Sequence, residues 1–281
     1  MLNLARRNLE IYFKSKATVF FSLMGTLIIF LLYIMFLGNL WTDIYTASSN
    51  NGLIDKWAMA GILSVVSMTS STGTLSIMVG DRTGAIRKDF YASPVSSSKI
   101  VGGYILAATA IGLLMSVISL VLASIFIAIR GNQLVSVTVL LEVLLALTLV
   151  SLSNSAIMIL FASFFKNHGA FTSSVGIVNT LAGFVAGAYI PIGMFPRPLQ
   201  ILMQVLPIYN GSVVLRNILM RDDLNDIDMS ASEIENLSVA LGVRIRWGEA
   251  LQSISISYII IGVALVVALV FAGINLYKRE E

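Results

Sequence analysis

Apolar residues in this chain fall into long runs that are separated by short polar and charged segments. A helical run of about 20 apolar residues is long enough to cross the hydrocarbon core of a bilayer. Six runs reach that length: Thr18–Gly38, Trp57–Val79, Ile100–Ile129, Leu134–Phe165, Ala170–Tyr189 and Leu251–Tyr277. The pattern therefore predicts an all-α integral membrane protein with six transmembrane helices.

Composition agrees with this prediction, because the 281 residues are 57% hydrophobic and only 12% charged. Soluble domains carry about twice that share of charged residues. The predicted spans use most of the chain, so no continuous stretch remains for a separate soluble enzyme domain. The absence of cysteine excludes disulfides, zinc–thiolate sites and cysteine nucleophiles.

The distribution of Lys and Arg predicts the direction of the spans, since cytoplasmic segments carry the excess of positive charge. Eleven of the 18 Lys and Arg residues fall on the side that holds both chain ends, and seven fall on the other side. Nine of the 15 acidic residues lie on that second side. Both termini are therefore predicted to be cytoplasmic.

Two predicted cytoplasmic segments have amphipathic character. Residues 1–16 place apolar side chains at helical spacing, which favours a helix lying on the membrane surface; an extension of the first span is the alternative. Residues 80–98 combine charges with Ile86 and Phe90, four positions apart, and a break at Pro94. A short exposed helix or a solvated loop fits this second segment.

Four of the five prolines follow the fifth predicted span, in a stretch that is still strongly apolar. Proline interrupts a straight helix, whereas a broken helix that enters the membrane and turns back accommodates it. We therefore predict an extracytoplasmic re-entrant hairpin over residues 191–220, with two extra crossings as the alternative. Its candidate gate residues are Pro191, Phe195, Pro196 and Pro207.

Residues 221–249 are polar and acidic. Ser230 and Glu233 have the spacing of a capping box, and Gly242 is a helix stop, so a small surface helix is predicted between them. The cluster of aspartates before it lacks the central Gly and closing Glu of a calcium loop. A solvated acidic cap is the favoured interpretation.

The spans hold few residues that can carry chemistry. The one histidine, His168, lies at a predicted cytoplasmic turn and cannot assemble a metal site alone. Glu142 is an acid within the fourth span, where it indicates function unless it is a boundary residue that reaches the membrane surface. No P-loop pattern G-x-x-x-x-G-K-[ST] occurs, so any ATP hydrolysis must come from another chain.

The second span is dense in hydroxyl groups, which would gain nothing by facing lipid. They indicate either a substrate path or ordinary helix packing. The candidate lining residues for a path are Ser67, Ser70, Ser71, Thr74 and Asn179. In the fifth span, Gly183 and Gly187 form a G-x-x-x-G pair, a common pattern that permits close helix approach.

These features, in this order, resemble the membrane subunits of type-2 ATP-binding-cassette exporters. The first match is Asp81-Arg82-Thr83-Gly84-Ala85, Ile86, Phe90 and Ser93-Pro94-Val95. The second is Gly187, Ile190-Pro191-Ile192, Phe195-Pro196, Leu199, Leu206-Pro207, Tyr209 and Leu215-Arg216. Ala85 stands where the family often has Thr, and Asp81 where Glu is usual.

The resemblance implies that residues 80–98 hold a cytoplasmic coupling helix that docks on a separate ATPase. Its coupling residues would be Asp81, Arg82, Gly84, Ile86, Arg87, Phe90 and Pro94. It also implies one permease domain over residues 1–281. This domain comprises an interfacial helix (1–16), five spans (17–190), the hairpin (191–220), the polar cap (221–249) and a sixth span (250–277).

The implied function is ATP-driven export of an amphipathic or lipid-like substrate, such as a drug, antimicrobial peptide, lipid or glycolipid, across a bacterial cell membrane. ATP and Mg²⁺ would bind the partner ATPase, and this chain would hold no cofactor, metal or catalytic site. A second permease subunit, identical or paralogous, and membrane lipid are the other expected partners; nucleic acid is not. The alternative is a non-transporting immunity or sensor protein.

Overall fold

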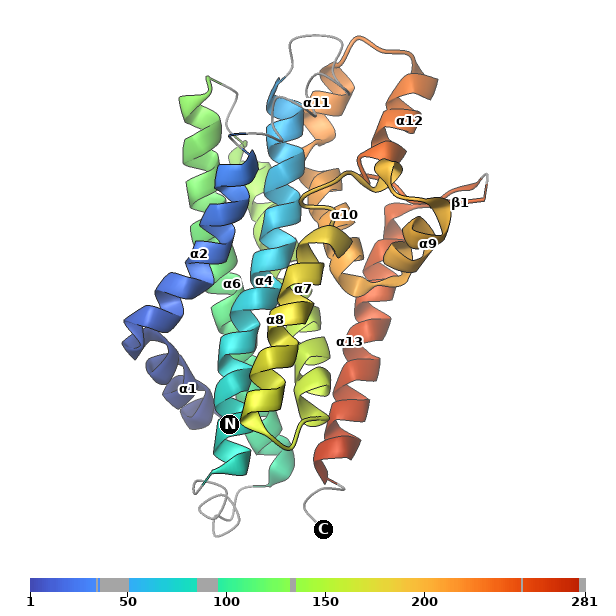
Figure 1. Cartoon of the computed structure of the whole chain (residues 1–281). Coiled ribbons are helices and arrows are strands. Elements are labelled where there is room, and N and C mark those ends of the chain that lie inside the picture. The colour runs from blue at the N-terminus through green and yellow to red at the C-terminus, as the bar shows by residue number, and fades with distance from the viewer. Residues whose placement is uncertain (34, 36–50, 85–95, 132–134, 249, 278–281) are drawn as a thin grey trace.

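The computed structural model describes the chain except for residues 34, 36–50, 85–95, 132–134, 249 and 278–281. Within the described residues, four helices are long and apolar enough to cross a membrane by length and composition. They are α4 (Asn51–Thr83), α6 (Ser97–Ile129), α7 (Val137–Ser163) and α13 (Ile254–Tyr277). They pack side by side in one bundle (Figure 1), so the chain is an all-α, multi-pass membrane protein.

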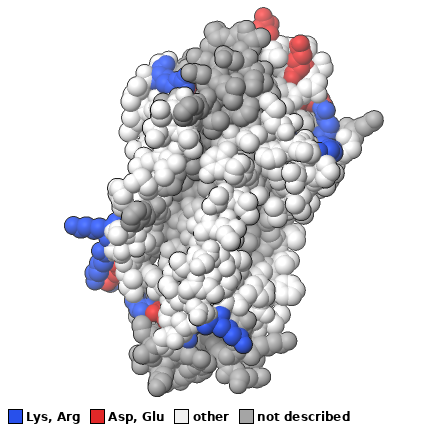
Figure 2. Space-filling model, viewed as in Figure 1, with Lys and Arg blue, Asp and Glu red and all other residues white. Residues whose placement is uncertain are grey.

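The surface of this bundle suits lipid. The outward side of α13 exposes large apolar side chains, among them Val263, Val266 and Phe271. Figure 2 shows that the centre of the visible face carries no charged side chain. An apolar band between charged ends is the surface that a bilayer requires.

Two of the six predicted spans are not among these four helices. α2 (Lys16–Leu32) covers only part of the first predicted span, most of whose remainder lies outside the described residues. α8 (His168–Val185) matches the fifth in position, but several Ser, Thr and Asn residues interrupt its apolar character. The described chain thus supports four spans, or up to five if one bent helix pair is counted as a span.

The N-terminal segment forms a helix of its own. α1 (Leu2–Lys14) is followed by Ser15, and α2 continues at an angle to it (Figure 1). Ala5, Asn8 and Tyr12 form the buried side of α1, which packs against α6 and α4. α1 and α2 are therefore two helices and not one continuous helix.

Both Met1 and the end of α13 lie at the same end of the bundle, which we call the N/C end (Figure 1). The opposite end, which we call the distal end, carries α11 (Arg221–Asp226), α12 (Ala231–Ala240) and a two-stranded ribbon. The ribbon consists of β1 (Arg246–Trp247) and β2 (Ala250–Leu251), which pair antiparallel.

The proline-rich segment forms a short 3-10 helix, η2 (Ile192–Met194), and the bent pair α9 (Arg197–Val205) and α10 (Pro207–Leu219). The two helices meet at 88°. Pro207 is the first residue of α10, where its missing N–H costs nothing. α10 is buried almost throughout and packs against α4, α7 and α13. The geometry is that of a broken span or a re-entrant segment.

The predicted surface helix is confirmed as α12. The Ser230 hydroxyl accepts from the backbone N–H of Glu233 at 3.3 Å, and the Glu233 carboxylate accepts from the backbone N–H of Ser230 at 2.9 Å. Gly242 adopts φ +70° just after the helix, a conformation that favours glycine. Local sequence signals were sufficient here because both caps form within the segment itself.

Candidate functional site

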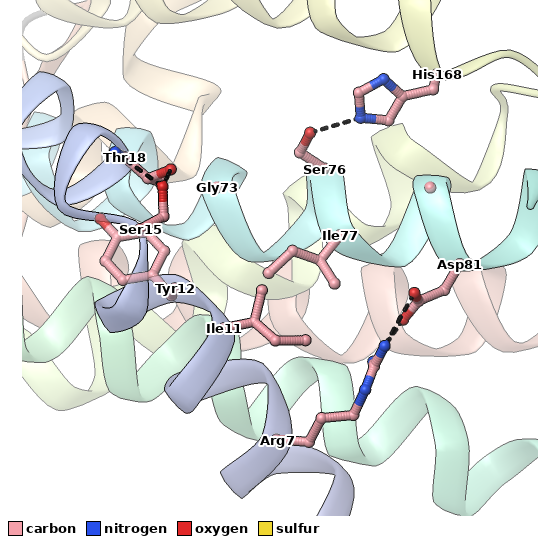
Figure 3. A pocket seen from close by; sticks show the side chains of 11 residues that line it. Arg7, Ile11, Tyr12, Ser15, Thr18, Gly73, Ser76, Ile77, Asp81 and His168 are labelled. Carbon is pink, nitrogen blue, oxygen red and sulfur yellow. Dashed lines mark hydrogen bonds and ion pairs between the residues drawn. The ribbon is translucent and has the colours of Figure 1, made fainter. Parts of the chain in front are cut away.

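A cavity of about 510 Å³ opens at the N/C end between α1, α4 and the first residue of α8 (Figure 3). One part of its wall is polar, with Arg7, Ser76, Asp81 and His168, and another is apolar. The lining residues are Arg7, Ile11, Tyr12, Ser15, Thr18, Gly73, Ser76, Ile77, Gly80, Asp81 and His168. The Ser76 hydroxyl lies 2.9 Å from Nε2 of His168, so α4 and α8 are joined across this space.

Three helices meet at Asp81 on the edge of this cavity. Arg7 of α1 donates from Nη1 to Oδ2 at 2.7 Å and from Nη2 to Oδ1 at 3.2 Å. Tyr104 of α6 donates its hydroxyl to Oδ2 at 2.6 Å. The hydrogen bond and charge of Asp81 raise the pKa of Arg7 above its ordinary value. The Asp81 side chain is only 6% exposed, so this network fastens α1 to the ends of α4 and α6.

The structure changes the expected place of Asp81. It lies in the last turn of α4, which continues to Thr83, and not in an exposed loop beginning at residue 80. Arg82 belongs to the same turn, and the backbone N–H of Gly84 still bonds to the carbonyl of Gly80 at 2.9 Å. The other expected coupling residues, Ile86, Arg87, Phe90 and Pro94, lie outside the described residues.

The hydroxyl groups of α4 face other helices of the same chain. Ser67 accepts a hydrogen bond from Nδ2 of Asn154 at 2.7 Å, and the Ser71 and Ser155 hydroxyls lie 2.9 Å apart. Ser70 lies 3.0 Å from the hydroxyl of Ser22 in α2. Thr74 is fully buried, and Asn179 of α8 is half-buried. In this structure the packing alternative accounts for the contacts of the three serines.

The two glycines of the G-x-x-x-G pair, Gly183 in α8 and Gly187 just after it, pack against other residues of the same chain. A Cβ built on Gly183 would collide with the ring of Tyr189, and one built on Gly187 would lie 3.2 Å from Nη2 of Arg216. A Cβ built on Gly176, about two turns before Gly183, would have nothing within 4 Å. The first two glycines therefore make room for neighbours in the same subunit.

Glu142 is paired at the distal end of the bundle. Its carboxylate lies 2.6 Å from Nη2 of Arg221, and the two side chains are 44% and 45% exposed. Such an exposed pair contributes roughly 0–1 kcal/mol. The pair joins α7 to the first residue of α11, and Glu142 is not an isolated buried acid.

Buried ion pairs at the distal end were not found from the sequence. Asp55 of α4 accepts from Tyr33 at 2.8 Å and from Arg130 at 2.9 Å. Its neighbour Lys56 lies 2.7 Å from Asp223 of α11. Adjacent opposite charges at the start of a long helix give no sequence signal of burial, because their partners are distant in the chain.

The candidate gate residues lie at the breaks between η2, α9 and α10. Pro191 and Phe195 flank η2, and Pro196 precedes α9. In α10, Arg216 is fully buried, with its Cζ 5.1 Å from the centroid of the Trp57 ring. We call this region the distal junction, defined by Trp57, Arg216, Ala186–Gly187 and Leu241–Gly242.

Among the described residues, no three His, Asp or Glu side chains gather closely enough to hold a metal ion. The chemistry that the two regions offer is therefore the binding of polar groups and the joining of helices.

The model of one protein family, described as "ABC-2 family transporter protein", matches residues 39–273, which is most of the chain. No curated protein matches the chain.

Proposed function

The chain belongs to the ABC-2 transporter family, and from this premise we propose that it is the permease subunit of an ATP-driven exporter. A separate ATPase binds and hydrolyses ATP with Mg²⁺, since the chain has no P-loop. The substrate is amphipathic or lipid-like and leaves the cytoplasm or the inner leaflet. A bacterial cell membrane is its location.

The observation that carries this proposal is the network at Asp81. It ties α1, α4 and α6 together immediately before residues 85–95, the segment whose sequence resembles the family's coupling helix. A force applied to that segment by a moving ATPase reaches all three helices at once. Three joined helices are a route by which ATP binding alters the packing of the bundle.

The N/C end is the cytoplasmic end in this proposal. The sequence segments that we predict to be cytoplasmic carry the larger share of Lys and Arg, and the described members of these segments, such as Arg7 and Arg82, lie at this end. α1 then lies at the cytoplasmic membrane surface, and α2 and α8 complete six spans with α4, α6, α7 and α13. The pair α9–α10 forms a re-entrant hairpin from the outer side, below an extracytoplasmic cap built from α11, α12 and the ribbon.

The cavity at the N/C end supports an amphipathic cargo. Its wall offers charged and hydroxyl groups beside Ile11 and Ile77, so a polar head and an apolar tail each find matching surface. The cavity opens beside α8, whose outer side exposes Ile177, Leu181 and Phe184. A second permease, identical or paralogous, covers this side and completes a path between the two subunits.

Replacement of Phe90 by aspartate tests the coupling assignment. A charge on the apolar side of the coupling segment should prevent docking, so the ATPase no longer co-purifies and substrate no longer stimulates ATP hydrolysis. The matched control is Val137→Asp, which places the same charge on a residue 73% exposed at the distal end. If the ATPase still co-purifies with Phe90→Asp and substrate still stimulates ATP hydrolysis, this segment does not have the coupling role.

The second candidate function is a non-transporting immunity or sensor protein that binds a toxin through its outer cap. The acidic residues of α11 and the exposed side of α12 favour it, because they form a polar surface at the distal end. The two functions differ in their partner. An exporter subunit requires an ATPase, and a sensor does not.

A further inference from the structure

Arg216 presents an electrostatic problem. It is fully buried, and none of the ion pairs among the described residues includes it. A buried guanidinium without a counter-charge is strongly unfavourable, so other groups must compensate it. We propose that the C-terminal ends of α8 and α12 provide this compensation, and that Arg216 and Trp57 form a latch that holds the distal end of the subunit closed.

The end of α8 is shaped to receive a cation. Gly187 adopts φ +65°, its N–H bonds to the carbonyl of Phe184 at 3.0 Å, and the N–H of Ala188 bonds to Gly183 at 2.9 Å. This helix termination leaves the next carbonyls free beyond the last turn. The C-terminal end of a helix carries partial negative charge. A cation beside these carbonyls is therefore stabilised without a carboxylate.

Arg216 binds these free carbonyls directly. Its Nη2 donates to the oxygens of Ala186 at 3.0 Å and Gly187 at 2.7 Å. One turn earlier in α10, the Ser212 hydroxyl also donates to Ala186, at 2.8 Å. The end of α8 is thus fastened to α10 by two side chains on the same side of that helix.

α12 ends in the same way as α8, and its end is bound by Trp57. Gly242 adopts φ +70°, and the two terminal backbone bonds measure 3.1 and 2.8 Å. The free carbonyl of Leu241 accepts a hydrogen bond from Nε1 of Trp57 at 2.8 Å. Because the Arg216 guanidinium packs against the Trp57 ring, both helix ends are held by one stacked pair.

Glycines allow this close approach. A Cβ built on Gly242 would lie 3.0 Å from Nη1 of Arg216 and 2.9 Å from the Tyr209 hydroxyl. One built on Gly61 of α4 would lie 3.1 Å from Nη2. With Gly187, whose Cβ would lie 3.2 Å from Nη2, three glycines adjoin the guanidinium, and any larger side chain would displace it from the carbonyls.

The latch can be released because its partners are neutral groups. When α8 and α12 separate from the stacked pair, the backbone hydrogen bonds that end each helix stay intact. Water can then solvate the guanidinium. Nε and Nη1 of Arg216 make no hydrogen bond in the closed junction, so they gain partners when water enters. The latch rests on the proposed function in one respect only, which is the opening of the distal end during transport.

A single-cysteine experiment tests the latch, and the chain has no native cysteine to interfere. Ser212→Cys places a thiol in the junction, where the residue is fully buried. In purified protein in lipid nanodiscs, we expect a polyethylene-glycol maleimide to label this thiol at least about tenfold faster when Arg216→Met is added. The control thiol, Ser155→Cys, is equally buried in α7 and should stay unreactive with either residue at 216.

Two results would overturn the latch. Equal labelling of Ser212→Cys with Arg216 and with Arg216→Met would show that Arg216 does not hold the junction. Equal acceleration at Ser155→Cys would show that Arg216 only supports general packing. With the partner ATPase present, ATP should also accelerate labelling of Ser212→Cys in the chain that retains Arg216. If ATP does not change the labelling rate, the latch is not released during transport. The comparison of Arg216 with Arg216→Met needs no ATPase, so its result is independent of the proposed function.

Discussion

In an Arg7→Ala variant, the amide hydrogens of α1 should exchange roughly 30- to 150-fold faster than in the original chain. The variant removes both hydrogen bonds to Asp81 and leaves that buried carboxylate with the Tyr104 hydroxyl. Loss of a partner to a buried charge costs about 2–3 kcal/mol, and each 1.4 kcal/mol is a factor of about ten. Hydrogen exchange measured by mass spectrometry reports this release directly. Substrate stimulation of the assembled transporter should fall with it.

The adjacent arginine provides the matched control. Arg6 pairs with Glu10 at 3.0 Å on the exposed side of the same helix, where the two side chains are 83% and 48% exposed. Such a pair contributes roughly 0.5 kcal/mol or less. Arg6→Ala should therefore change exchange in α1 by about twofold at most. Similar exchange in the two variants would contradict the anchoring role of the Arg7–Asp81 pair.

A Gly112→Ala variant is expected to lose about 1–3 kcal/mol of stability, or roughly 2–10 °C in melting temperature. Gly112 lies on α6 where it crosses α4. An added Cβ would lie 2.6 Å from the backbone oxygen of Ser67 and 2.8 Å from the Ser71 hydroxyl. The two helices must move apart, because one of these atoms belongs to backbone that cannot rotate away. Thermal unfolding of the purified chain in detergent measures the loss.

Gly262→Ala is the control for this change, since nothing lies within 4 Å of a Cβ at that position of α13. Alanine favours a helix over glycine by about 1 kcal/mol, so this variant should be as stable as the original or slightly more so. The comparison also tests the role of the α4 hydroxyls. If Gly112→Ala is harmless, α4 and α6 are not packed closely there, and a path lined by Ser67 and Ser71 becomes the better interpretation.

The parts of the fold that sequence predicts well are those whose signals are local. α12 was predicted from Ser230, Glu233 and Gly242, because a capping box and a glycine stop form within a few residues. The apolar runs predicted α4, α6, α7 and α13, although α4 begins six residues before the expected start at Trp57. Polar residues such as Asp55 predict a loop. In the structure Asp55 is buried in the helix, because Tyr33 and Arg130 are its hydrogen-bond partners.

The same reason explains the different position of Asp81. A charged stretch after an apolar run predicts a loop, but Arg7, 74 positions earlier, neutralises Asp81 and the helix continues. For the serines of α4, the sequence predicted a polar side but not its direction. Direction depends on Asn154 and Ser155, which α7 brings within hydrogen-bond distance.

The distal junction was beyond sequence analysis because its partners are backbone atoms. Arg216 bonds to carbonyls 29 and 30 positions away, and every residue type carries a carbonyl. The available signal was an arginine in an apolar stretch together with two glycines, Gly187 and Gly242, each just after a helix. Such a combination becomes informative only when the helix ends are known to converge.

The central claim is that this chain is the membrane part of a transporter powered by a separate ATPase that docks beside the Asp81 network. The most direct test is to purify the tagged chain from its native membranes and to measure bound protein and ATP hydrolysis. We predict a P-loop ATPase in equal amount, with hydrolysis that ends when its P-loop lysine is replaced. A correctly folded chain that carries no P-loop protein would contradict the claim and favour a sensor.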